Sequence, residues 1–553
     1  MSALFDTHRD RLDKAVEATR TRGYWSPFPE MPSGKIYGET AKADGEAAFE
    51  AMRGQRFELP AHPGAGDVGS ETSPYGLDLS IRYPSAVPGD LVAAANTAGR
   101  DWGKASVAAR VGVCLEILDR LNKQSFLLAN AVMHTTGQAF MMAFQAGGAH
   151  AQDRGLEAVA YAYDAMRAVP GDVLWEKPQG KLDPIRLDKT FRVVPRGVAL
   201  VIGCATFPTW NGYPGLFASL ATGNPVIVKP HPGAILPLAI TVRIGREVLS
   251  EAGFDPNVLL LAADAPGAEI TKDLVTHPDV RIVDFTGSSA FGQWVRENAG
   301  DADVYTEEAG VNPIAITGTD NFKAMTQNIA FSLSLYSGQM CTAPQNLFVP
   351  RDGIETDQGH KSFDEVADGL ALALDKLLGD PERAAAICGA VQNQATLDRV
   401  GESIALGAVA RASGQIEGLE SGRTATPLVV KLDSVKDQDT YLEERFGPIS
   451  FVIATESAED AIDRAASSAR ARGAITSAIY AADEALIDRA IDAFADAGVA
   501  LSINLYGNIH VNQSAAFSDF HVSGANPAGN ACLTDQAFVA NRFRVVTIRR
   551  LAA

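Results

Sequence analysis

Cysteine is scarce in this chain, and its few cysteines are scattered. Five occur among 553 residues, and no two of them are spaced as Cys-x-x-Cys. Disulfide frameworks and structural zinc sites both need cysteines in closely spaced pairs. We therefore expect neither, and free thiols of this kind indicate the reducing environment of the cytoplasm.

Positive charge is also in short supply, because 48 lysines and arginines stand against 67 aspartates and glutamates, a formal net charge of −19. Nucleic acids and anionic membranes are bound through stripes of basic residues, and this sequence has none, so neither is an expected partner. One uncharged run, residues 197–228, is long enough to span a bilayer. Proline and glycine interrupt it repeatedly, so it predicts a buried strand, loop, helix and strand instead.

What the chain does contain is an alternation of strands and helices. After a helical N-terminal part, whose last helical pattern covers 123–168, short aliphatic stretches alternate with helical spacing between residues 198 and 292. This pattern predicts a doubly wound parallel sheet, on which ligands bind beyond the carboxyl ends of the strands. A second cycle of the same kind follows residue 341, and the Gly-, Asn- and Ser-rich stretch 505–537 predicts a loop.

Two other stretches predict antiparallel strands. Residues 171–196 alternate on either side of Pro178–Gly180, which is typical of a β-hairpin. The chain ends in a basic, strand-like stretch, Asn541–Arg550. Strands at a chain end often pair with another element or another subunit, so we expect these two to take part in assembly.

A cysteine on a turn is the first candidate for chemistry. An apolar helical stretch runs from Phe331 to Gly338, turns, and places Cys341 just ahead of Pro344. The thiolate of such a residue can meet a substrate, whereas a cysteine inside a packed helix usually cannot. Taken alone, however, Cys341 is better explained as a small buried hydrophobe.

Three other stretches place polar groups at strand ends. Glu307 and Glu308 end a strand-like segment, and Glu307 lies 34 residues before the cysteine (341 − 307). Gly287 and Ser288 lie between a strand and a helix, whose N-terminal amides can hold a phosphate. Lys229 ends a strand where the ribose of a dinucleotide would lie. Each signal is weak alone, because Ser288 is equally well explained as a helix cap and Lys229 as a surface lysine.

Together these stretches resemble the aldehyde dehydrogenase superfamily, in order and spacing, over roughly residues 100–550. The motifs are Gly223-Asn-Pro-Val-Ile-Val-Lys229-Pro, His277-Pro-Asp-Val with Phe285-Thr-Gly-Ser288, Glu307-x-x-Gly-x-Asn312-Pro313, Gly338-Gln-x-Cys341 and Glu443-Glu-x-Phe-Gly-Pro448. Within the superfamily, residues 203–212 and the long N-terminal segment resemble the branch of the phenylacetic acid degradation protein PaaN.

The resemblance implies an α/β fold with two doubly wound parallel-sheet domains and a small oligomerisation β-hairpin. The implied division is an N-terminal helical segment with the first part of the cofactor-binding domain (1–170), the hairpin (171–196), a Rossmann-like domain (197–308), a catalytic domain (309–537) and a C-terminal oligomerisation strand (538–553). A homodimer or homotetramer follows from the hairpin and the terminal strand.

The resemblance also implies the catalytic roles. Cys341 would attack an aldehyde to give a thiohemiacetal, and Glu307 would activate the water that hydrolyses the later thioester. Thr206 stands where the family commonly has an asparagine that donates to the oxyanion, and Asn211 is the alternative donor. Losing such a donor costs roughly 10²–10³ in rate. Glu308-Ala309 and Val311 are further departures from the family motif.

For the cofactor, the resemblance implies a nicotinamide dinucleotide. Lys229 would bind the adenosine ribose, Gly287 and Ser288 the pyrophosphate, and Glu444 the nicotinamide ribose with Phe446 packed beside it. The acidic residue often found three positions after the lysine is missing. With His231 next to this position, that absence favours NADP over NAD, because a carboxylate there would repel a 2′-phosphate.

The implied reaction oxidises a small-molecule aldehyde to a carboxylic acid. For the PaaN branch, the substrate is a CoA-linked semialdehyde from phenylacetate catabolism. Two alternatives stay open: release of the acyl group to CoA instead of water, and a dinucleotide-binding protein that has lost turnover. Glu307 argues against the first, because transfer to a thiol needs no water-activating base, and the pairing of Cys341 with Glu307 argues against the second.

Overall fold

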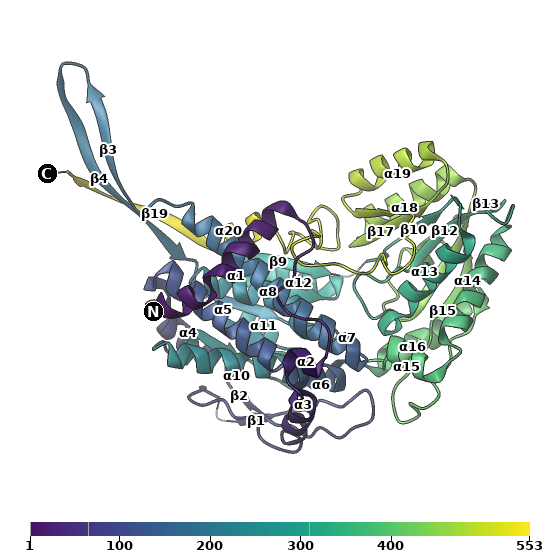
Figure 1. Cartoon of the computed structure of the whole chain (residues 1–553), viewed down its shortest axis with the longest axis horizontal. Helices are drawn as coiled ribbons and strands as arrows, with labels where there is room; N and C mark the ends of the chain where they lie inside the picture. Colours follow the sequence, from purple (N-terminus) through teal and green to yellow (C-terminus); the bar gives the residue numbers. More distant parts are fainter. Residues whose placement is uncertain (1, 65, 309, 553) are drawn as a thin grey trace.

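A five-stranded parallel sheet forms the framework of one half of the molecule (left in Figure 1). The structure is a computed structural model that describes residues 2–64, 66–308 and 310–552. The strand order is β7-β6-β5-β8-β9, so the direction of winding reverses between β5 and β8, and a ligand crevice is expected there. The strands are β5 (Val198–Ile202), β6 (Val226–Lys229), β7 (Leu259–Leu261), β8 (Val280–Gly287) and β9 (Asp303–Glu308).

Helices cover this sheet on both faces, which explains why β5, β6 and β7 are buried along their whole length. The connecting helices are α9 (Pro208–Ala221), α10 (Leu236–Glu251), α11 (Ile270–Val275) and α12 (Ser289–Asn298). The N-terminal elements are α1 (Ser2–Thr21), α2 (Gly34–Tyr37), α3 (Ala41–Glu50), β1 (Gly66–Val68), β2 (Tyr83–Ser85), α4 (Pro88–Lys104), α5 (Val107–Lys123), α6 (Ser125–Thr136), α7 (Phe140–Phe144) and α8 (His150–Arg167). The helical pattern over 123–168 is thus interrupted, because Gly137 ends α6 with φ of 88°.

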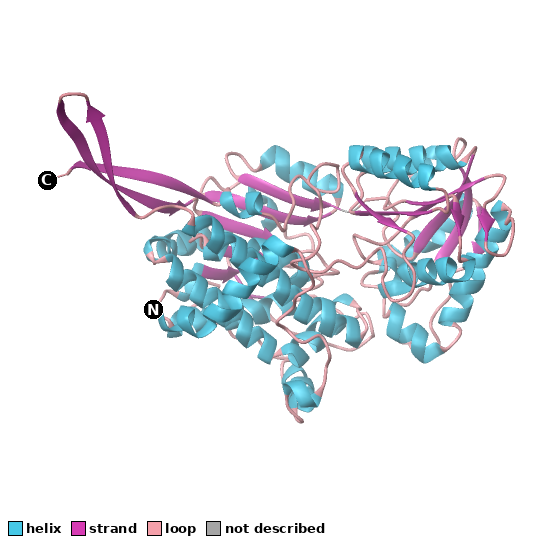
Figure 2. Ribbon diagram, turned by 45° about the horizontal axis from the view of Figure 1, so that its top comes forward, coloured by secondary structure: helices cyan, strands magenta, loops and turns pink. Residues whose placement is uncertain are grey.

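The second half is built on a seven-stranded sheet of order β14-β15-β16-β12-β10-β17-β18, in which only β14 runs antiparallel to its neighbour (right in Figure 1; Figure 2). Its strands are β10 (Ile314–Ile316), β12 (Asn346–Pro350), β14 (Ala408–Arg411), β15 (Leu428–Asp433), β16 (Ile449–Thr455), β17 (Thr476–Tyr480) and β18 (Ala500–Ile503). Its helices are α13 (Phe322–Ser334), α14 (Phe363–Leu378), α15 (Pro381–Cys388), α16 (Gln394–Ser403), α17 (Gln438–Tyr441), α18 (Ala458–Arg472) and α19 (Glu484–Asp496), and β11 (Gly318–Thr319) pairs with β13 (Glu355–Thr356). Both predicted parallel sheets are confirmed.

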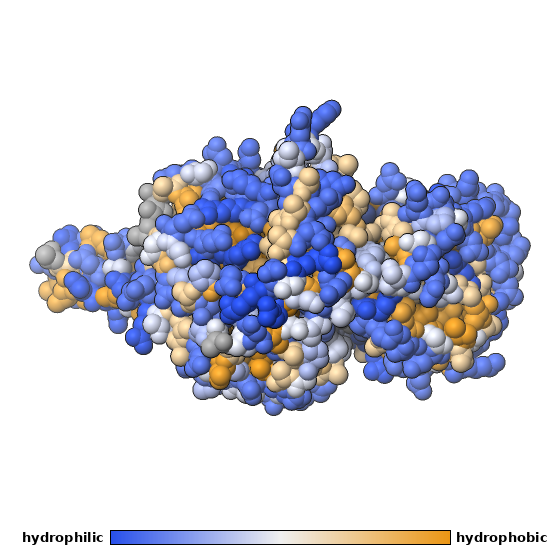
Figure 3. All heavy atoms as spheres, turned by 90° about the horizontal axis from the view of Figure 1, so that it is seen from below, coloured by the Kyte–Doolittle hydropathy of each residue, from blue (hydrophilic) through white to orange (hydrophobic). Residues whose placement is uncertain are grey.

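A three-stranded antiparallel arm projects from the first half (Figures 1 and 2). It consists of the predicted hairpin, β3 (Asp172–Gln179) and β4 (Leu182–Pro195), and of the terminal strand β19 (Phe543–Leu551), which pairs with β4. Short helix α20 (Gln536–Ala540) precedes β19. Arg542, fully buried at the base of the arm, donates to both carboxylate oxygens of Asp284 on β8 and so fixes the terminal strand to the five-stranded sheet. Orange hydrophobic atoms lie exposed on the arm, at the left of Figure 3.

Among the described residues, no helix combines the length and apolarity needed to cross a membrane. Residues 505–535 contain no helix or strand of their own, as the composition of this loop predicts. This loop runs between the two halves and contacts the end of β9. It is therefore placed to contribute to a site formed by strand ends.

Candidate active site

A strained turn presents Cys341. Helix α13 ends at Ser334, and the next residues include Tyr336 and Ser337 with φ of 51° and 48°, the left-handed region that side chains seldom adopt. Gly338 follows with φ of 62°, and a Cβ there would lie 2.5 Å from the carbonyl oxygen of Gly447. The chain therefore reverses abruptly and places the partly exposed residue Cys341 on a fixed turn, as the sequence predicts.

Asn312 holds this turn from the motif that follows Glu307. Its Nδ2 donates to the carbonyl oxygens of Cys341 at 2.8 Å and Ala343 at 2.9 Å, and its Oδ1 accepts the amide of Ile475 at 2.9 Å. One buried side chain thus ties the cysteine segment to the segment ahead of β17. The asparagine of the family motif has a positioning role in this structure.

Glu307 lies near the end of β9, the edge strand of the five-stranded sheet. The free edge is paired by the C-terminal loop, since Glu307 bridges to Gly529 and the amide of Glu308 donates to the carbonyl of Ala528 at 2.6 Å. Neighbouring side chains on a strand point to opposite faces. Glu308 therefore points away from Glu307 and forms an ion pair with Arg296 on α12.

The side chains of Cys341 and His521 both lie close to that of Glu307. Atoms of Glu307, Cys341 and His521 all lie within 4.8 Å of one another. The Cys341 sulfur is one neighbour of the carboxylate. The other partners are Nε2 of His521, 3.0 Å from Oε1, and Nδ2 of Asn211, which donates to Oε2 at 2.9 Å. The side chain of Glu307 is only 1% exposed.

The electrostatics of the pair favour a protonated thiol beside an ionised carboxylate. Burial by itself raises the pKa of Glu307, but the adjacent His521 and the hydrogen bonds from His521, Cys341 and Asn211 lower it below the ordinary value. Burial, together with the charge of Glu307, raises the pKa of the Cys341 thiol well above the ordinary value. The ionised carboxylate is therefore in the form that can accept a proton, and it lies within 4.8 Å of the thiol that has one to give.

Thr206 lies in the loop after β5, where the winding of the sheet reverses. Its carbonyl oxygen accepts a hydrogen bond from Nε2 of Gln138 at 2.8 Å, and its hydroxyl lies within hydrogen-bonding reach of the Cys204 thiol. Among the described residues, no hydrogen bond joins Thr206 to Cys341 or Glu307. Of Thr206 and Asn211, it is Asn211, on the first turn of α9, that contacts the Glu307 carboxylate.

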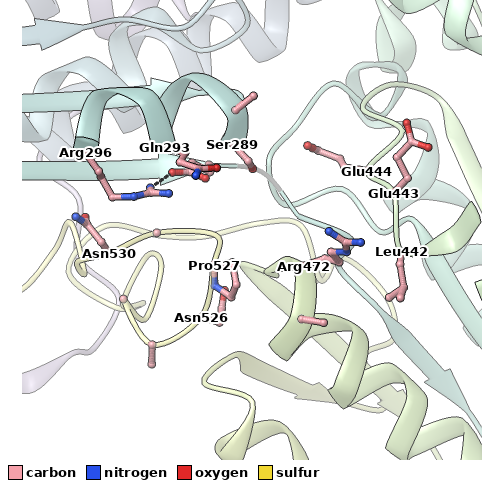
Figure 4. Close-up of a pocket in the computed structure, with 16 residues that line it drawn as sticks. Ser289, Gln293, Arg296, Leu442, Glu443, Glu444, Arg472, Asn526, Pro527 and Asn530 are labelled. Atoms are coloured by element: carbon pink, nitrogen blue, oxygen red, sulfur yellow. Dashed lines mark hydrogen bonds and ion pairs between the residues drawn. The ribbon is translucent and has the colours of Figure 1, made fainter. Parts of the chain in front are cut away.

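A cavity of about 840 Å³ opens beside this centre, at the face of β9 that carries Glu308 (Figure 4). Glu444 projects across it toward the N-terminal end of α12, whereas Glu443 points away. Burial, reinforced by the charge of Glu308 and partly offset by Arg399, raises the pKa of Glu444 to about 7. The other lining residues are Ser289, Ala290, Gln293, Arg296, Leu442, Ala471, Arg472, Gly524, Ala525, Asn526, Pro527, Gly529 and Asn530.

The residues predicted to hold a dinucleotide come from both halves: Lys229 and Gly287 end β6 and β8, on either side of β5, whereas Glu444 and Phe446 lie ahead of β16. Gly287 ends β8, and Ser288 caps α12 without a side-chain capping bond, so the first turn of this helix lies open at the cavity. Phe446 is partly exposed and its carbonyl accepts a hydrogen bond from Arg399 at 2.6 Å. A helix N-terminus that faces a cavity across from a carboxylate fits a pyrophosphate and a ribose.

Lys229 has a partner that the sequence does not reveal. Its ammonium group is buried and lies 2.7 Å from Oδ1 of Asp264, which follows β7. Burial lowers the pKa of Lys229, and Asp264 offsets part of this effect. His231 is exposed beside this pair, and its Nδ1 accepts the amide of Gly233 at 3.0 Å. A carboxylate that follows the strand next to β6 therefore lies beside Lys229.

Comparison with known proteins identifies the family. The model of the aldehyde dehydrogenase family matches residues 86–535. This chain belongs to the aldehyde dehydrogenase family. A solved NAD-dependent aldehyde dehydrogenase from Burkholderia multivorans is 58% identical, with a TM-score of 0.98 over 100% of this chain and 99% of that one. 1-Pyrroline-5-carboxylate dehydrogenase of Thermus thermophilus, 18% identical with a TM-score of 0.74 over 96% of this chain and 99% of that one, shows the same fold.

Two curated relatives have names that specify aromatic aldehydes. Vanillin dehydrogenase of Corynebacterium glutamicum is 29% identical over 61% of this chain, and the match spans 65% of that protein, just under two thirds of its length. Benzaldehyde dehydrogenase (NAD(+)) of Pseudomonas putida is 25% identical over 68% of this chain and 72% of that protein. The family and its neighbours support a nicotinamide dinucleotide as cofactor.

Two residues of this site, His521 and Asp264, belong to none of the motifs that the sequence shares with the aldehyde dehydrogenase family. His521 lies in the predicted loop, where no pattern distinguishes it. Asp264 follows the strand-like stretch 258–261. Because the carboxyl ends of parallel strands lie at one edge of a sheet, this position could have been predicted to lie near Lys229. Ala309, one departure from the family motif, lies outside the described residues.

Proposed function

We propose that this member of the aldehyde dehydrogenase family oxidises an aldehyde to a carboxylic acid, with Cys341 as nucleophile and Glu307 as base. The observation that carries the proposal is the position of the Cys341 sulfur within 4.8 Å of the buried Glu307 carboxylate, whose two oxygens are held by His521 and Asn211. A buried carboxylate lowers the free energy of unfolding unless all of its hydrogen bonds are made. A purely structural role therefore explains this contact poorly.

The chemistry follows from this contact. Glu307 takes the proton of Cys341, and the sulfur forms a bond to the aldehyde carbon to give a thiohemiacetal. A nicotinamide dinucleotide, when bound, supplies the hydride acceptor for the oxidation of that carbon to a thioester. Glu307 releases that first proton to solvent and then takes a proton from the attacking water; the carbon–sulfur bond breaks, the proton passes from Glu307 to the Cys341 sulfur, and the acid leaves. The balance is aldehyde, water and oxidised dinucleotide to acid, reduced dinucleotide and a proton.

The oxyanion formed on the aldehyde oxygen needs donors. Thr206 and the Cys341 backbone amide are one pair, and the Asn211 amide is the alternative donor. Asn211 already approaches the centre through Glu307, at 2.9 Å. Its Nδ2 carries a second hydrogen, so it can donate to the substrate oxygen while it keeps its hydrogen bond to Glu307. We therefore favour Asn211 over Thr206 for this role.

For the substrate, we propose an aromatic aldehyde or an aldehyde derived from an aromatic compound. The names of the two curated relatives support the first, and the resemblance to the PaaN branch supports a CoA-linked semialdehyde. A screen of benzaldehyde, vanillin and aliphatic aldehydes, followed by the absorbance of the reduced nicotinamide, tests the proposal. Acid formation without CoA supports it, and the absence of turnover with every aldehyde would overturn it. A strict need for CoA would indicate acyl transfer instead.

Asp264 is expected to select NAD, although the sequence alone favours NADP. The NADP expectation rests on the missing carboxylate beside Lys229, and the carboxylate of Asp264, 2.7 Å from Lys229, supports NAD instead. We expect Asp264→Asn to lower kcat/KM for NAD by roughly 10–100-fold relative to NADP, because a charge-assisted hydrogen bond to the 2′-hydroxyl is lost and repulsion of a 2′-phosphate ends. Steady-state kinetics with both dinucleotides measures the ratio. The exposed Asp273→Asn is the matched control, and an unchanged ratio in Asp264→Asn would contradict this assignment.

The arm is expected to form the interface between copies of the chain. Val546, 50% exposed, and Ile548, 36% exposed, lie two residues apart on one face of β19, and such apolar strand surfaces are covered in stable proteins. We expect the wild type to sediment as a dimer or tetramer and the double variant Val546→Asp, Ile548→Asp as a smaller species. Ile404→Asp, an exposed isoleucine in the other half, is the control. A monomeric wild type would refute the prediction.

A further inference from the structure

We propose that His521 is a positioning residue of the reaction, which donates a hydrogen bond to Glu307 and keeps that carboxylate ionised and aimed at Cys341. The inference rests on the proposed function, because it assigns a role to His521 through Glu307. It concerns a loop residue that no motif marks and that lies 214 residues from Glu307 in sequence.

The imidazole is fixed on several sides. Its side chain is 2% exposed, and Nε2 lies 3.0 Å from Oε1 of Glu307. The ring stands edge-on to Trp210 of α9, with 4.5 Å between ring centroids and an interplanar angle of 81°. Its backbone is tied to the same loop, because the amide donates to Oγ1 of Thr534 at 3.1 Å and the carbonyl accepts the amide of Leu533 at 3.3 Å. The ring therefore has little freedom to leave Glu307.

Two N–H donors hold the two oxygens of Glu307. His521 serves Oε1 and Asn211 serves Oε2, so the carboxylate plane is fixed. An ionised carboxylate accepts hydrogen bonds at both oxygens, which requires the Nε2–H form of His521 or its cation. Because Glu307 is 1% exposed, water cannot replace a lost donor fully. Removing His521 leaves a buried anion that is stabilised only by Asn211 and the thiol.

Other titratable groups near this pair are few among the described residues. The thiols of Cys341 and Cys204 approach Glu307 from the turn after α13 and from the loop after β5. On α8, Arg154 lies over the Trp210 ring, 4.8 Å from its centroid, and forms an ion pair with Glu157. Cys532 lies in the same loop as His521 and contacts Thr534. Among the described residues, the hydrogen-bond partner of Oε1 is His521.

The test compares His521→Leu with His521→Gln, which keeps an N–H donor without a titratable ring, and with His521→Asn. In the leucine variant we expect kcat/KM to fall roughly 10–100-fold, and the acidic limb of its pH profile to move about one to two pH units upward, because the loss of a donor raises the pKa of Glu307. We expect glutamine or asparagine to restore most of the shift. The control is His360→Gln, an exposed histidine of the other half.

A second readout needs no substrate. The rate of iodoacetamide alkylation of Cys341, followed by peptide mass against pH, reports the proton transfer to Glu307 directly, so it is informative even if no aldehyde is oxidised. A leucine variant that folds, by circular dichroism and thermal unfolding, and keeps the wild-type acidic limb in alkylation would overturn the inference. A shift that neither glutamine nor asparagine restores would also overturn it. Failure of the wild type in the aldehyde screen alone would overturn only the proposed function.

Discussion

Replacing Cys341 with serine is expected to lower kcat/KM for aldehyde oxidation by on the order of 10⁴-fold. The hydroxyl is nearly the same size as the thiol, so the turn after α13 should fold as before. A serine hydroxyl, however, releases its proton far less readily than a thiol, and Glu307 is too weak a base to take it. The variant should still bind the dinucleotide, since the cavity is unchanged.

Steady-state kinetics with any aldehyde that the wild type oxidises measures this loss. The matched control is Cys204→Ser, which changes a thiol that is also partly exposed and lies near the same centre. Its activity should stay within about tenfold of wild type, because only its hydrogen bond to Asn211 is altered. Equal losses in the two variants would mean that Cys341 has no special role as nucleophile.

The second large effect is expected for Glu307→Gln. An amide cannot accept a proton, so both the deprotonation of Cys341 and the activation of water lose their base, and general base catalysis contributes roughly 10²–10⁴ in rate. We expect slow formation of reduced dinucleotide and still slower release of acid, with acyl-enzyme accumulating. Rapid-mixing absorbance resolves the first step, and quenched acid release resolves the second.

Glu308→Gln is the control, because Glu308 is the next residue on β9 and points away from the thiol. Its loss breaks the ion pair with Arg296 at the cavity, so we expect a change in KM for the dinucleotide and little change in acid release. If Glu307→Gln released acid at the wild-type rate, the assignment of Glu307 as base would be refuted. Restoration of turnover by CoA would indicate that the thioester passes to a thiol.

The sequence predicts the framework of the site because its signals are local. Short aliphatic strands with helices between them predict a doubly wound sheet. Lys229, Gly287 and Glu307 lie at or near the carboxyl ends of such strands, so all three are expected at one edge of the sheet. The stretch that ends at Gly338 predicts the turn of Cys341. The hairpin at 171–196 follows from alternation about Gly180, and its pairing with the terminal strand agrees with the expectation for a chain end.

The remaining parts of the site depend on contacts that no local pattern encodes. His521 reaches Glu307 because a loop without regular structure pairs with the free edge of β9, and loop packing is decided by tertiary contacts. Asp264 meets Lys229 only because β7 lies beside β6, which is a property of strand order. The expectation of NADP was made without this carboxylate, and the choice between NAD and NADP stays a prediction. The end of helix α6 at Gly137 is not indicated by the sequence, because apolar residues keep helical spacing on both sides of it.

The most direct test of the central claim is the mass of the peptide that contains Cys341 in Glu307→Gln, quenched after mixing with NAD(+) and an aldehyde that the wild type oxidises. A thioester on Cys341, with the mass of the acyl group and dependent on both the aldehyde and NAD(+), is the predicted result. An unmodified Cys341 peptide, or an acyl group attached to Cys204 instead, would contradict the account.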